Sequence, residues 1–432
     1  MTACVAIIGG GPAGAVTALQ LARAGVSVAV IDRLTGEPWK IGEGLPPAAK
    51  PILQRLGLWE RFLADEHLAS YGNCSAWGAS ALVDHSFVFN PHGCGWHLDR
   101  TRFDEMLLDA AIESGAKLIS GVGLRSCRQV GSSWWLHGKK LLQELPEPTA
   151  EAQRTLSKHR DSGETLCDPS LMLWDSAVEN ADGESLSSND SVSIKADFVI
   201  DASGRGSWFA RRQGARRINH DNLVGLAVLL KTERETDRDS LTLVEAVADG
   251  WWYTALLPCK RLVAVFLSDA DLEATRMART AKGWKRLLDQ TLYLRERVER
   301  HGYQIELGPK IVSANSSHLD LTTGETWLAA GDAAVAFDPL SSQGITTAME
   351  SGILAAEAIL NGTAKALNSY SQRLEQVFTA YLASKDSYYA QERRWPDSTF
   401  WLRRHNKLID RRIQGNAVSV NHSPQPLTME NP

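Results

Sequence analysis

The sequence feature that most constrains the fold is a glycine-rich turn that directly follows an apolar N-terminal stretch. Residues 3–8 are apolar and predict a buried strand, and a helical stretch at 15–24 and a second apolar strand at 26–31 come after the turn. The turn has the form Gly-x-Gly-x-x-Gly, with its glycines at Gly9, Gly11 and Gly14. The second strand ends at Asp32. This order of strand, turn, helix, strand and acid predicts a Rossmann βαβ unit that binds a dinucleotide.

Each part of the glycine turn has a physical role. Gly9 permits the tight turn, Gly11 lets the backbone approach a pyrophosphate, and Gly14 lets the helix pack closely on the sheet. The first helical turn offers free backbone N–H groups to the phosphates, and Asp32 is placed to accept a hydrogen bond from a ribose hydroxyl. The cofactor-binding residues predicted from this unit are Gly9, Gly11, Pro12, Ala13, Gly14 and Asp32.

A second motif lies roughly 300 residues further along the chain. An apolar strand at 326–330 leads into Gly331-Asp332, then a loop at 337–344, then a helix rich in small residues. The loop has the sequence Phe337-Asp338-Pro339-Leu340-Ser341-Ser342-Gln343-Gly344. This arrangement resembles the second flavin motif of the FAD-dependent aromatic hydroxylase superfamily. The resemblance implies that FAD is the cofactor, that Asp332 binds its ribityl chain, and that Pro339, Gly344 and Ile345 lie at the isoalloxazine.

Two shorter segments support the same resemblance. The segment from Arg100 to Leu107 is similar to one that opens a helix against the FAD, which implies that Arg100 contacts the cofactor. The segment Asp201-Ala202-Ser203-Gly204 resembles the Asp-x-Ser-Gly variant of the flavin-dependent tryptophan halogenases, which implies that Asp201 and Gly204 contact FAD. Aromatic hydroxylases carry Asp-Gly there and use it for NAD(P)H. The electron donor is therefore expected to be NAD(P)H or another external reductant.

A third segment falls where this superfamily has a loop close to the flavin. It contains Arg33 and Gly42-Glu43-Gly44, followed by a predicted helix at 46–56. The resemblance implies that Arg33 and Glu43 contact the cofactor region, and Glu43 is a candidate catalytic acid or base. The alternative for Glu43 is a helix-capping or surface carboxylate.

The candidate substrate pocket is aromatic, in a chain with 14 tryptophans among 432 residues. The candidate substrate contacts are Trp77, Trp96, Trp251, Trp252 and Tyr253. Trp251 to Tyr253 alternate along a predicted strand, so one face of that strand is expected to be core. His97 is a candidate base that accepts a proton from an indole or phenol during oxygen transfer; the alternative is a structural histidine.

The predicted fold class is α/β. It combines a glutathione-reductase-type Rossmann FAD domain with a mixed β-sheet substrate domain of the aromatic-hydroxylase type and a helical C-terminal tail. The FAD domain is predicted at 1–66, 97–210 and 308–384, the substrate domain at 67–96 and 211–307, and the basic tail at 385–432. Within the substrate domain, strands are predicted at 223–231, 240–246, 251–257 and 262–268, and one amphipathic helix at 283–301. An acidic insertion of net charge −8 is predicted at about 141–197.

Composition excludes several classes of protein and partner. The net charge of −5 gives no basic field for nucleic acid. No apolar run is long enough to span a bilayer, so no membrane partner is expected. The six cysteines form no Cys-x-x-Cys pair, no metal-ligand set is visible, and a reduced, cytoplasmic protein is expected.

As a whole, the chain resembles the flavoprotein monooxygenases of tryptophylquinone cofactor biogenesis, which mature quinohemoprotein amine dehydrogenases and amino-acid oxidases. The residues that carry this resemblance are Gly9–Gly14, Gly42–Pro46, Asp201–Ser207, Trp251–Pro258 and Gly331–Gly344. The resemblance implies two oxygen insertions, with O2 as oxidant, into a tryptophan of a small partner subunit. The charges of the acidic insertion and the basic tail suggest that these segments bind the partner; the alternative for the tail is a solvated helix face.

Three alternatives stay open. A small-molecule aromatic hydroxylase and a halogenase share the fold, and a flavin-stabilised chaperone for the precursor would need no catalysis. Resemblance to tryptophan halogenases implies a lysine near Tyr71–Gly78 and a Trp-x-Trp-x-Ile-Pro motif. No lysine occurs from Pro51 to Ala116, and the nearest candidate for the motif is Gly250–Pro258, which does not match it. These absences favour hydroxylation.

Overall fold

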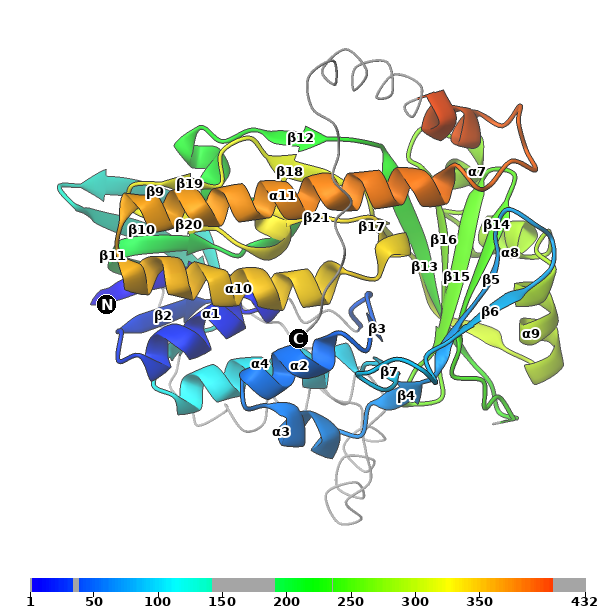
Figure 1. Cartoon of the computed structure of the whole chain (residues 1–432), viewed down its shortest axis with the longest axis horizontal. Helices are drawn as coiled ribbons and strands as arrows, with labels where there is room; N and C mark the ends of the chain where they lie inside the picture. The colour runs from blue at the N-terminus through cyan, green and yellow to red at the C-terminus, as the bar shows by residue number, and fades with distance from the viewer. Residues whose placement is uncertain (1, 34–38, 142–190, 235, 407–432) are drawn as a thin grey trace.

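The computed structural model describes residues 2–33, 39–141, 191–234 and 236–406 of the chain. Two large sheets stand side by side, with long helices running across the first sheet and short helices behind the second (Figure 1). The mixed α/β architecture predicted from the sequence is confirmed. The predicted division into an FAD domain and a substrate domain stays a prediction.

The first sheet has eight strands, and the glycine turn leaves its centre. Its main path runs β19-β20-β11-β1-β2-β8, and β10 joins β11 to β9. The strand β1 is parallel to both β11 and β2, as a Rossmann unit requires. The strands are β1 (Thr2–Ile8), β2 (Val28–Ile31), β8 (Lys117–Ile119), β9 (Val122–Val130), β10 (Ser133–Lys140), β11 (Ser191–Asp201), β19 (Thr323–Gly324) and β20 (Trp327–Ala329).

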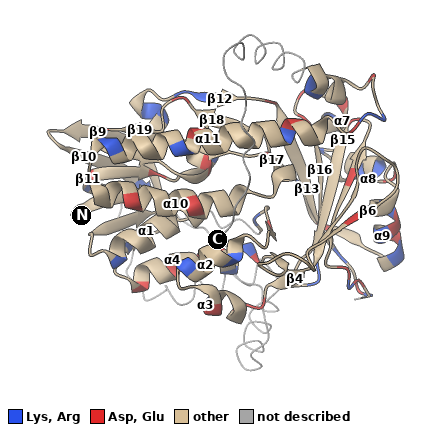
Figure 2. Cartoon of the chain, in the orientation of Figure 1, with Lys and Arg blue, Asp and Glu red and all other residues tan. Residues whose placement is uncertain are grey.

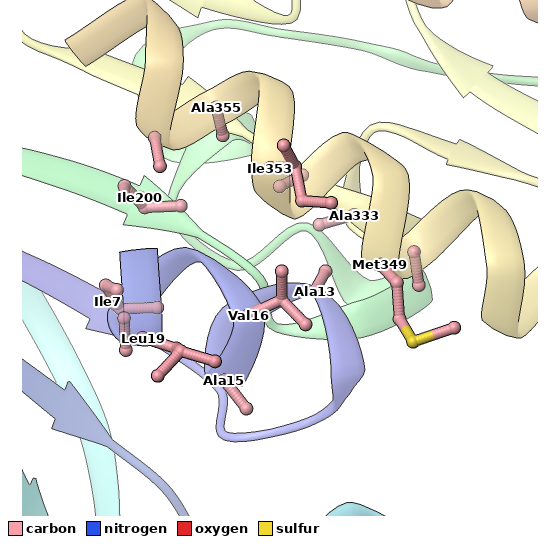
Figure 3. Close-up of a cluster of buried hydrophobic side chains, with 14 of the residues drawn as sticks. Ile7, Ala13, Ala15, Val16, Leu19, Ile200, Ala333, Met349, Ile353 and Ala355 are labelled. Carbon is pink, nitrogen blue, oxygen red and sulfur yellow. The ribbon is translucent and has the colours of Figure 1, made fainter. Parts of the chain in front are cut away.

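Six helices accompany this sheet among the described residues, and the two longest lie next to each other along it (Figure 1). They are α1 (Pro12–Arg23), α2 (Ala49–Arg55), α3 (Trp59–Ala64), α4 (Arg100–Glu113), α10 (Gly344–Asn361) and α11 (Ala364–Tyr389). Figure 3 shows how α1 and α10 pack, with Ala13 and Val16 on the side of α1 that is nearest to α10. The contact is close because a Cβ at Gly352 would lie 2.6 Å from the carbonyl oxygen of Ala13.

The second sheet has seven strands in the order β17-β13-β16-β15-β14-β5-β6. It is mixed, because β14 pairs parallel to β5 while its other ladders are antiparallel. Its strands are β5 (Gly72–Ala76), β6 (Val83–Ser86), β13 (Leu223–Lys231), β14 (Thr242–Val247), β15 (Gly250–Leu256), β16 (Leu262–Asp269) and β17 (Gln304–Ser313). Figure 2 shows charged residues on the outer helices and loops, while the central strands of this sheet carry few.

Both faces of the second sheet are covered by apolar side chains. One face packs on α7 (Glu273–Met277), α8 (Ala281–Leu288) and α9 (Tyr293–His301). The other face, with Trp251 and Val265, packs against Ile41, Leu340 and the C-terminal segment. Loop residues and the C-terminal segment therefore cover this second face of the second sheet, which we call the seam.

Short strands and 3-10 helices complete the fold. Two three-stranded sheets have the orders β3-β7-β4 and β12-β18-β21. Their strands are β3 (Gly44–Leu45), β4 (Leu68–Ser70), β7 (Gly95–His97), β12 (Arg217–Asn219), β18 (Ser317–Leu319) and β21 (Val335–Ala336). The 3-10 helices are η1 (Gly204–Gly206), η2 (Ala210–Gln213), η3 (Gly331–Ala333) and η4 (Pro339–Ser341).

The prediction of one continuous helix over 283–301 is wrong, because this region forms two helices, α8 and α9. The Glu245 carboxylate reaches across from β14 and accepts hydrogen bonds from the backbone N–H groups of Leu292, Tyr293 and Leu294, at 2.5, 3.1 and 3.0 Å. A carboxylate there binds the free N–H groups of a helix start. A tertiary contact therefore starts a new helix within an unbroken amphipathic pattern.

Several predicted boundaries do not coincide with ends of elements. The boundary at 307/308 falls inside β17, and the boundary at 384/385 falls inside α11. Of the predicted acidic insertion, residues 142–190 lie outside the described residues, as does the tail beyond 406. None of the helices within the described ranges combines the length and apolar composition that a bilayer crossing requires.

Candidate functional site

The glycine turn after β1 has the geometry that its sequence predicts. Gly9 has a φ of +107°, and a Cβ there would lie 2.3 Å from the carbonyl oxygen of Ala202. A Cβ at Gly14 would lie 2.0 Å from the carbonyl oxygen of Gly9. Gly11 differs, because a Cβ there would meet no atom within 4 Å. Gly9 and Gly14 are therefore required by the fold itself, whereas Gly11 keeps a space open at the start of α1.

The Asp32 carboxylate faces this turn. The backbone N–H of Gly10 donates to Asp32 Oδ2 at 2.5 Å, and the carboxylate is half-buried. Arg33, which follows it, is exposed. The structure thus places Asp32 beside the glycine turn, where a ribose hydroxyl can reach it, and leaves Arg33 at the surface.

The second glycine motif lies directly against the first. Gly331 has a φ of +59°, and a Cβ there would lie 2.7 Å from the Cβ of Ala13. The backbone N–H of Gly331 donates to Ser351 Oγ on α10 at 2.9 Å. Gly331 therefore contacts both Ala13 in the first turn of α1 and Ser351 in the middle of α10. Two motifs that are far apart in the sequence form one continuous surface.

Asp332 forms an ion pair that the sequence did not predict. Arg205 Nε lies 3.4 Å from Asp332 Oδ2, and the Asp332 side chain is 38% exposed. The same guanidinium donates to the carbonyl oxygen of Phe337 at 2.8 Å and to that of Asn315 at 2.5 Å. Arg205 therefore holds Asp332 and the start of loop 337–344 together. Its only sequence signal was its place in the 201–207 segment.

Loop 337–344 presents its second half to solvent. Pro339, Ser342 and Gly344 are exposed, whereas Ile345 is buried at the first turn of α10. Ser342 has a φ of +51°, an uncommon backbone conformation for a residue other than glycine. The loop therefore offers exposed backbone beside a helix N-terminus, which suits an anionic ring edge.

Arg100 at the start of α4 holds the 41–43 loop. Its guanidinium donates to the carbonyl oxygens of Ile41 and Gly42 at 3.1 and 2.8 Å, and pairs with Asp104 at 3.2 Å. Its buried Nε has no hydrogen-bond partner among the described residues. A buried donor without a partner is costly, so Arg100 Nε is available to a bound group.

Asp201 is fully engaged within the protein. Its carboxylate is completely buried and accepts hydrogen bonds from Ser203 Oγ at 2.6 Å and from the backbone N–H groups of Phe209 and Ala210 at 2.8 Å each. These contacts shape the turn after β11, where Gly204 has a φ of +69°. The geometry favours a turn-forming role for both residues over direct contact with a cofactor.

The structure brings two predicted site residues, Glu43 and Tyr253, into direct contact. The Tyr253 hydroxyl on β15 donates a hydrogen bond to the Glu43 carboxylate. The backbone N–H of Gly42 donates to Glu43 Oε2 at 3.1 Å, and Glu43 is only 3% exposed. Burial raises the pKa of the Glu43 carboxyl, and burial also raises the pKa of Tyr253. The seam thus holds a buried acid whose proton affinity is increased.

His97 has the environment of a structural histidine. Its Nδ1 lies 2.8 Å from the carbonyl oxygen of Leu256, and its Nε2 lies 2.9 Å from the hydroxyl of Thr242. The carbonyl requires a proton on Nδ1, so Nε2 accepts from Thr242. Both nitrogens are occupied and the residue is 1% exposed. This geometry favours its role as a link from β7 to β14 and β15.

We expect His97 to make the fold acid-sensitive. Burial lowers the pKa of His97 to about 4, from 6.5 when it is unfolded. Between these values only the unfolded chain binds the proton, so stability falls as pH is lowered from 6.5 to 4, by roughly 3 kcal/mol for this residue. Urea unfolding at pH 7.5 and pH 5 tests this. His97→Gln should unfold more easily at pH 7.5 but lose less stability on acidification; an equal loss in both proteins would contradict the assignment.

The five aromatic candidates do not share one pocket. Trp96 packs with Trp59 and Phe62 in the hydrophobic core beside the first sheet. Trp252 packs on Trp284 at 5.0 Å, on the face of β15 that points to α8. The remaining three lie together on the seam face, and they are Trp77, Trp251 and Tyr253.

Basic and aromatic residues of the C-terminal segment contact other parts of the same chain. Residues 399–406 are helical, and Trp401 is completely buried against Trp77 at 5.3 Å. Arg403 and Arg404 pair with Asp269 at 3.0 and 2.9 Å. The described part of the predicted basic tail thus packs on the second sheet. Its predicted role in gripping a partner stays a prediction.

The described residues fit a dinucleotide flavin cofactor on two structural observations. Gly11 leaves open space at the start of α1, and Arg100 Nε is a buried donor without a partner among the described residues. Asp32, Asp332 and the α10 N-terminus border the same surface. These groups would hold a ribose, a ribityl chain and an anionic ring respectively.

Comparison with protein families agrees with this geometry. Residues 2–133 match the FAD binding domain family, and residues 176–423 match the tryptophan halogenase family. The first match confirms the predicted FAD cofactor. The second spans more than half of the chain.

Three known proteins are similar over nearly the whole chain. A protein of Marinomonas mediterranea named as an FAD-dependent oxidoreductase, LodB, is 28% identical over 404 residues, which cover 92% of this chain and 96% of LodB. The myxobacterial chondrochloren halogenase CndH superposes with a TM-score of 0.73 at 20% identity and covers 97% of this chain and 91% of its own. The peptidyl tryptophan dihydroxylase QhpG, described as essential for tryptophylquinone cofactor biogenesis, superposes with a TM-score of 0.62 at 20% identity, over 94% of this chain and 79% of its own. Both superpositions show the shared fold.

Proposed function

The chain belongs to the tryptophan halogenase family, and from this premise we propose that it is an FAD-dependent monooxygenase that hydroxylates a tryptophan side chain of a precursor protein during tryptophylquinone cofactor biogenesis. Membership makes it a flavoenzyme; the reaction and the protein substrate are the proposal. Its cosubstrate is O2, and its electrons come from NAD(P)H or another external reductant. Its partner is a small protein subunit that carries the target tryptophan.

The observation that carries the proposal is the contact between buried Glu43 and half-buried Tyr253 at the seam. Bound FAD supplies the reducing equivalents that activate O2. Oxygen insertion at an indole carbon leaves a proton to be removed from the ring. A carboxylate with a raised pKa is suited to accept it near neutral pH, and Tyr253 holds that carboxylate in one orientation.

The protein around this pair excludes water and supplies aromatic surface. Trp77 and Trp251 lie on the same face as Tyr253, with their ring centroids 6.1 Å apart. Trp251 is buried and supports this wall from behind, whereas the half-buried rings of Trp77 and Tyr253 favour an indole by edge-to-face contact. The likeness of the fold to QhpG, which acts on a peptidyl tryptophan, supports a tryptophan within a protein as the substrate.

Co-expression with a candidate precursor tests the proposal directly. We expect a mass gain of about 16 Da for each oxygen atom inserted into the target tryptophan, located by tandem mass spectrometry. The control is Glu43→Gln, which should retain FAD and leave the precursor unmodified. An FAD-loaded wild-type protein that leaves every candidate precursor unchanged but turns over free indoles would contradict the protein substrate.

A second candidate function is halogenation, which the family match and the likeness to CndH favour. The two reactions differ in their dependence on halide. If chloride or bromide were required for turnover, and the product carried the isotope pattern of chlorine or bromine, halogenation would replace hydroxylation. Turnover in halide-free buffer would exclude it.

A further inference from the structure

A stripe of polar side chains on α11 faces the start of loop 337–344. Tyr381, Lys385 and Tyr389 lie four residues apart, so they share one helix face. Tyr381 and Tyr389 are 3% and 2% exposed. Lys385 pairs with Asp221 at 2.7 Å between them. The stripe is therefore a buried polar contact surface.

Tyr381 and Tyr389 each form a hydrogen bond with Asp338, one with its backbone and one with its side chain. The backbone N–H of Asp338 donates to the hydroxyl oxygen of Tyr381 at 2.7 Å, and the Tyr389 hydroxyl donates to Asp338 Oδ2 at 2.8 Å. The other carboxylate oxygen accepts from the backbone N–H of Leu340 at 2.9 Å. Asp338 is 1% exposed, so water does not replace these partners. The position of the loop start therefore depends on α11.

Tyr389 also contacts the second sheet and the C-terminal segment. The indole Nε1 of Trp251 on β15 donates to the Tyr389 hydroxyl at 3.0 Å. The Tyr389 ring lies 5.5 Å from that of Trp77 and 6.0 Å from that of Trp401. Trp251 is two residues from Tyr253, which holds Glu43. The Tyr389 hydroxyl thus joins β15, the strand that carries Trp251 and Tyr253, to loop 337–344.

We propose that Tyr389 is a positioning residue that couples β15 to loop 337–344. It keeps the flavin loop and the substrate wall in a fixed position relative to each other. The inference rests on the proposed function, because that function places the loop at the flavin. Removal of the hydroxyl leaves Asp338 Oδ2 and Trp251 Nε1 buried with one partner fewer each, and the loop then relaxes relative to the sheet.

The test is Tyr389→Phe, which keeps the ring and removes only the hydroxyl. We expect FAD binding to the apoprotein, measured by fluorescence titration, to weaken roughly 10-fold, with a shift of the visible flavin absorption bands. For turnover, kcat should fall while KM changes little, because Tyr389 touches no substrate. Trp251→Phe removes the link to β15 but keeps the hydrogen bond from Tyr389 to Asp338, so it should shift the bands less.

The matched control is Tyr303→Phe. The Tyr303 hydroxyl donates to Asp237 Oδ2 at 3.1 Å, and Tyr303 is similarly buried, at 4% exposed. It belongs to the core on the other face of the second sheet, which does not contain Tyr389. It should lower stability without changing FAD affinity or the flavin bands. If Tyr389→Phe and Tyr303→Phe behaved alike in both measurements, the coupling role would be overturned. The proposed function fails separately, if wild-type protein binds FAD and modifies no tryptophan.

Discussion

The Gly11→Val variant is expected to keep its fold and to bind FAD at least about 100-fold more weakly than wild type, a loss near 2.7 kcal/mol. The reason is geometric. Gly11 has a φ of −69° and a ψ of −178°, which valine adopts without strain, and a Cβ there meets nothing within 4 Å. The added side chain instead fills the space that a pyrophosphate needs. Fluorescence titration of the apoprotein with FAD measures the affinity, and circular dichroism verifies the fold.

Gly14→Val provides the contrast within the same turn. Its Cβ would lie 2.0 Å from the carbonyl oxygen of Gly9, so the backbone itself must move. We expect this variant to lose thermal stability even without cofactor. The interpretation of Gly11 would be refuted by a folded Gly11→Val protein with wild-type FAD affinity.

Glu43→Gln is expected to lower kcat by about 10²- to 10⁴-fold, the usual contribution of a general base. Glutamine has the same shape and keeps one acceptor oxygen for these donors, but its amide cannot take up a proton. FAD affinity should change little. The wild-type rate should rise with pH as Glu43 ionises, at a higher pH than for an ordinary carboxyl because burial raises the pKa of Glu43. The variant should lack this rise.

Tyr253→Phe tests the hydrogen bond between Tyr253 and Glu43 while leaving the Glu43 carboxyl in place. Loss of the hydroxyl removes a hydrogen bond that favours the ionised form of Glu43, so the pKa of Glu43 should rise further and the pH profile should move to higher pH. Glu245→Gln is the control, because Glu245 is a buried glutamate that caps α9 away from the seam. It should reduce stability while leaving the pH profile in place. Wild-type kcat in Glu43→Gln would rule out Glu43 as the base.

The sequence predicted most of the elements of the fold because their signals are local. Four of the seven strands of the second sheet, β13 to β16, and the helix after the first glycine turn follow from apolar patterns and turn residues. The prediction of a single helix at 283–301 failed because the start of α9 is set by Glu245 of β14, more than 40 residues earlier in the chain. A hydrophobic pattern contains no information on such a distant capping group.

The sequence by itself determined the two flavin motifs, since Gly9, Gly14 and Gly331 are dictated by backbone conformation and by contacts that any side chain would break. The tertiary structure alone decided which other residues meet. It paired Glu43 with Tyr253, enclosed both nitrogens of His97, and placed Trp252 on the face away from the seam. It also brought Tyr389 to Asp338. The physical reason is that hydrogen bonds and burial at the seam depend on how two sheets pack, and that packing joins residues whose spacing along the chain carries no pattern.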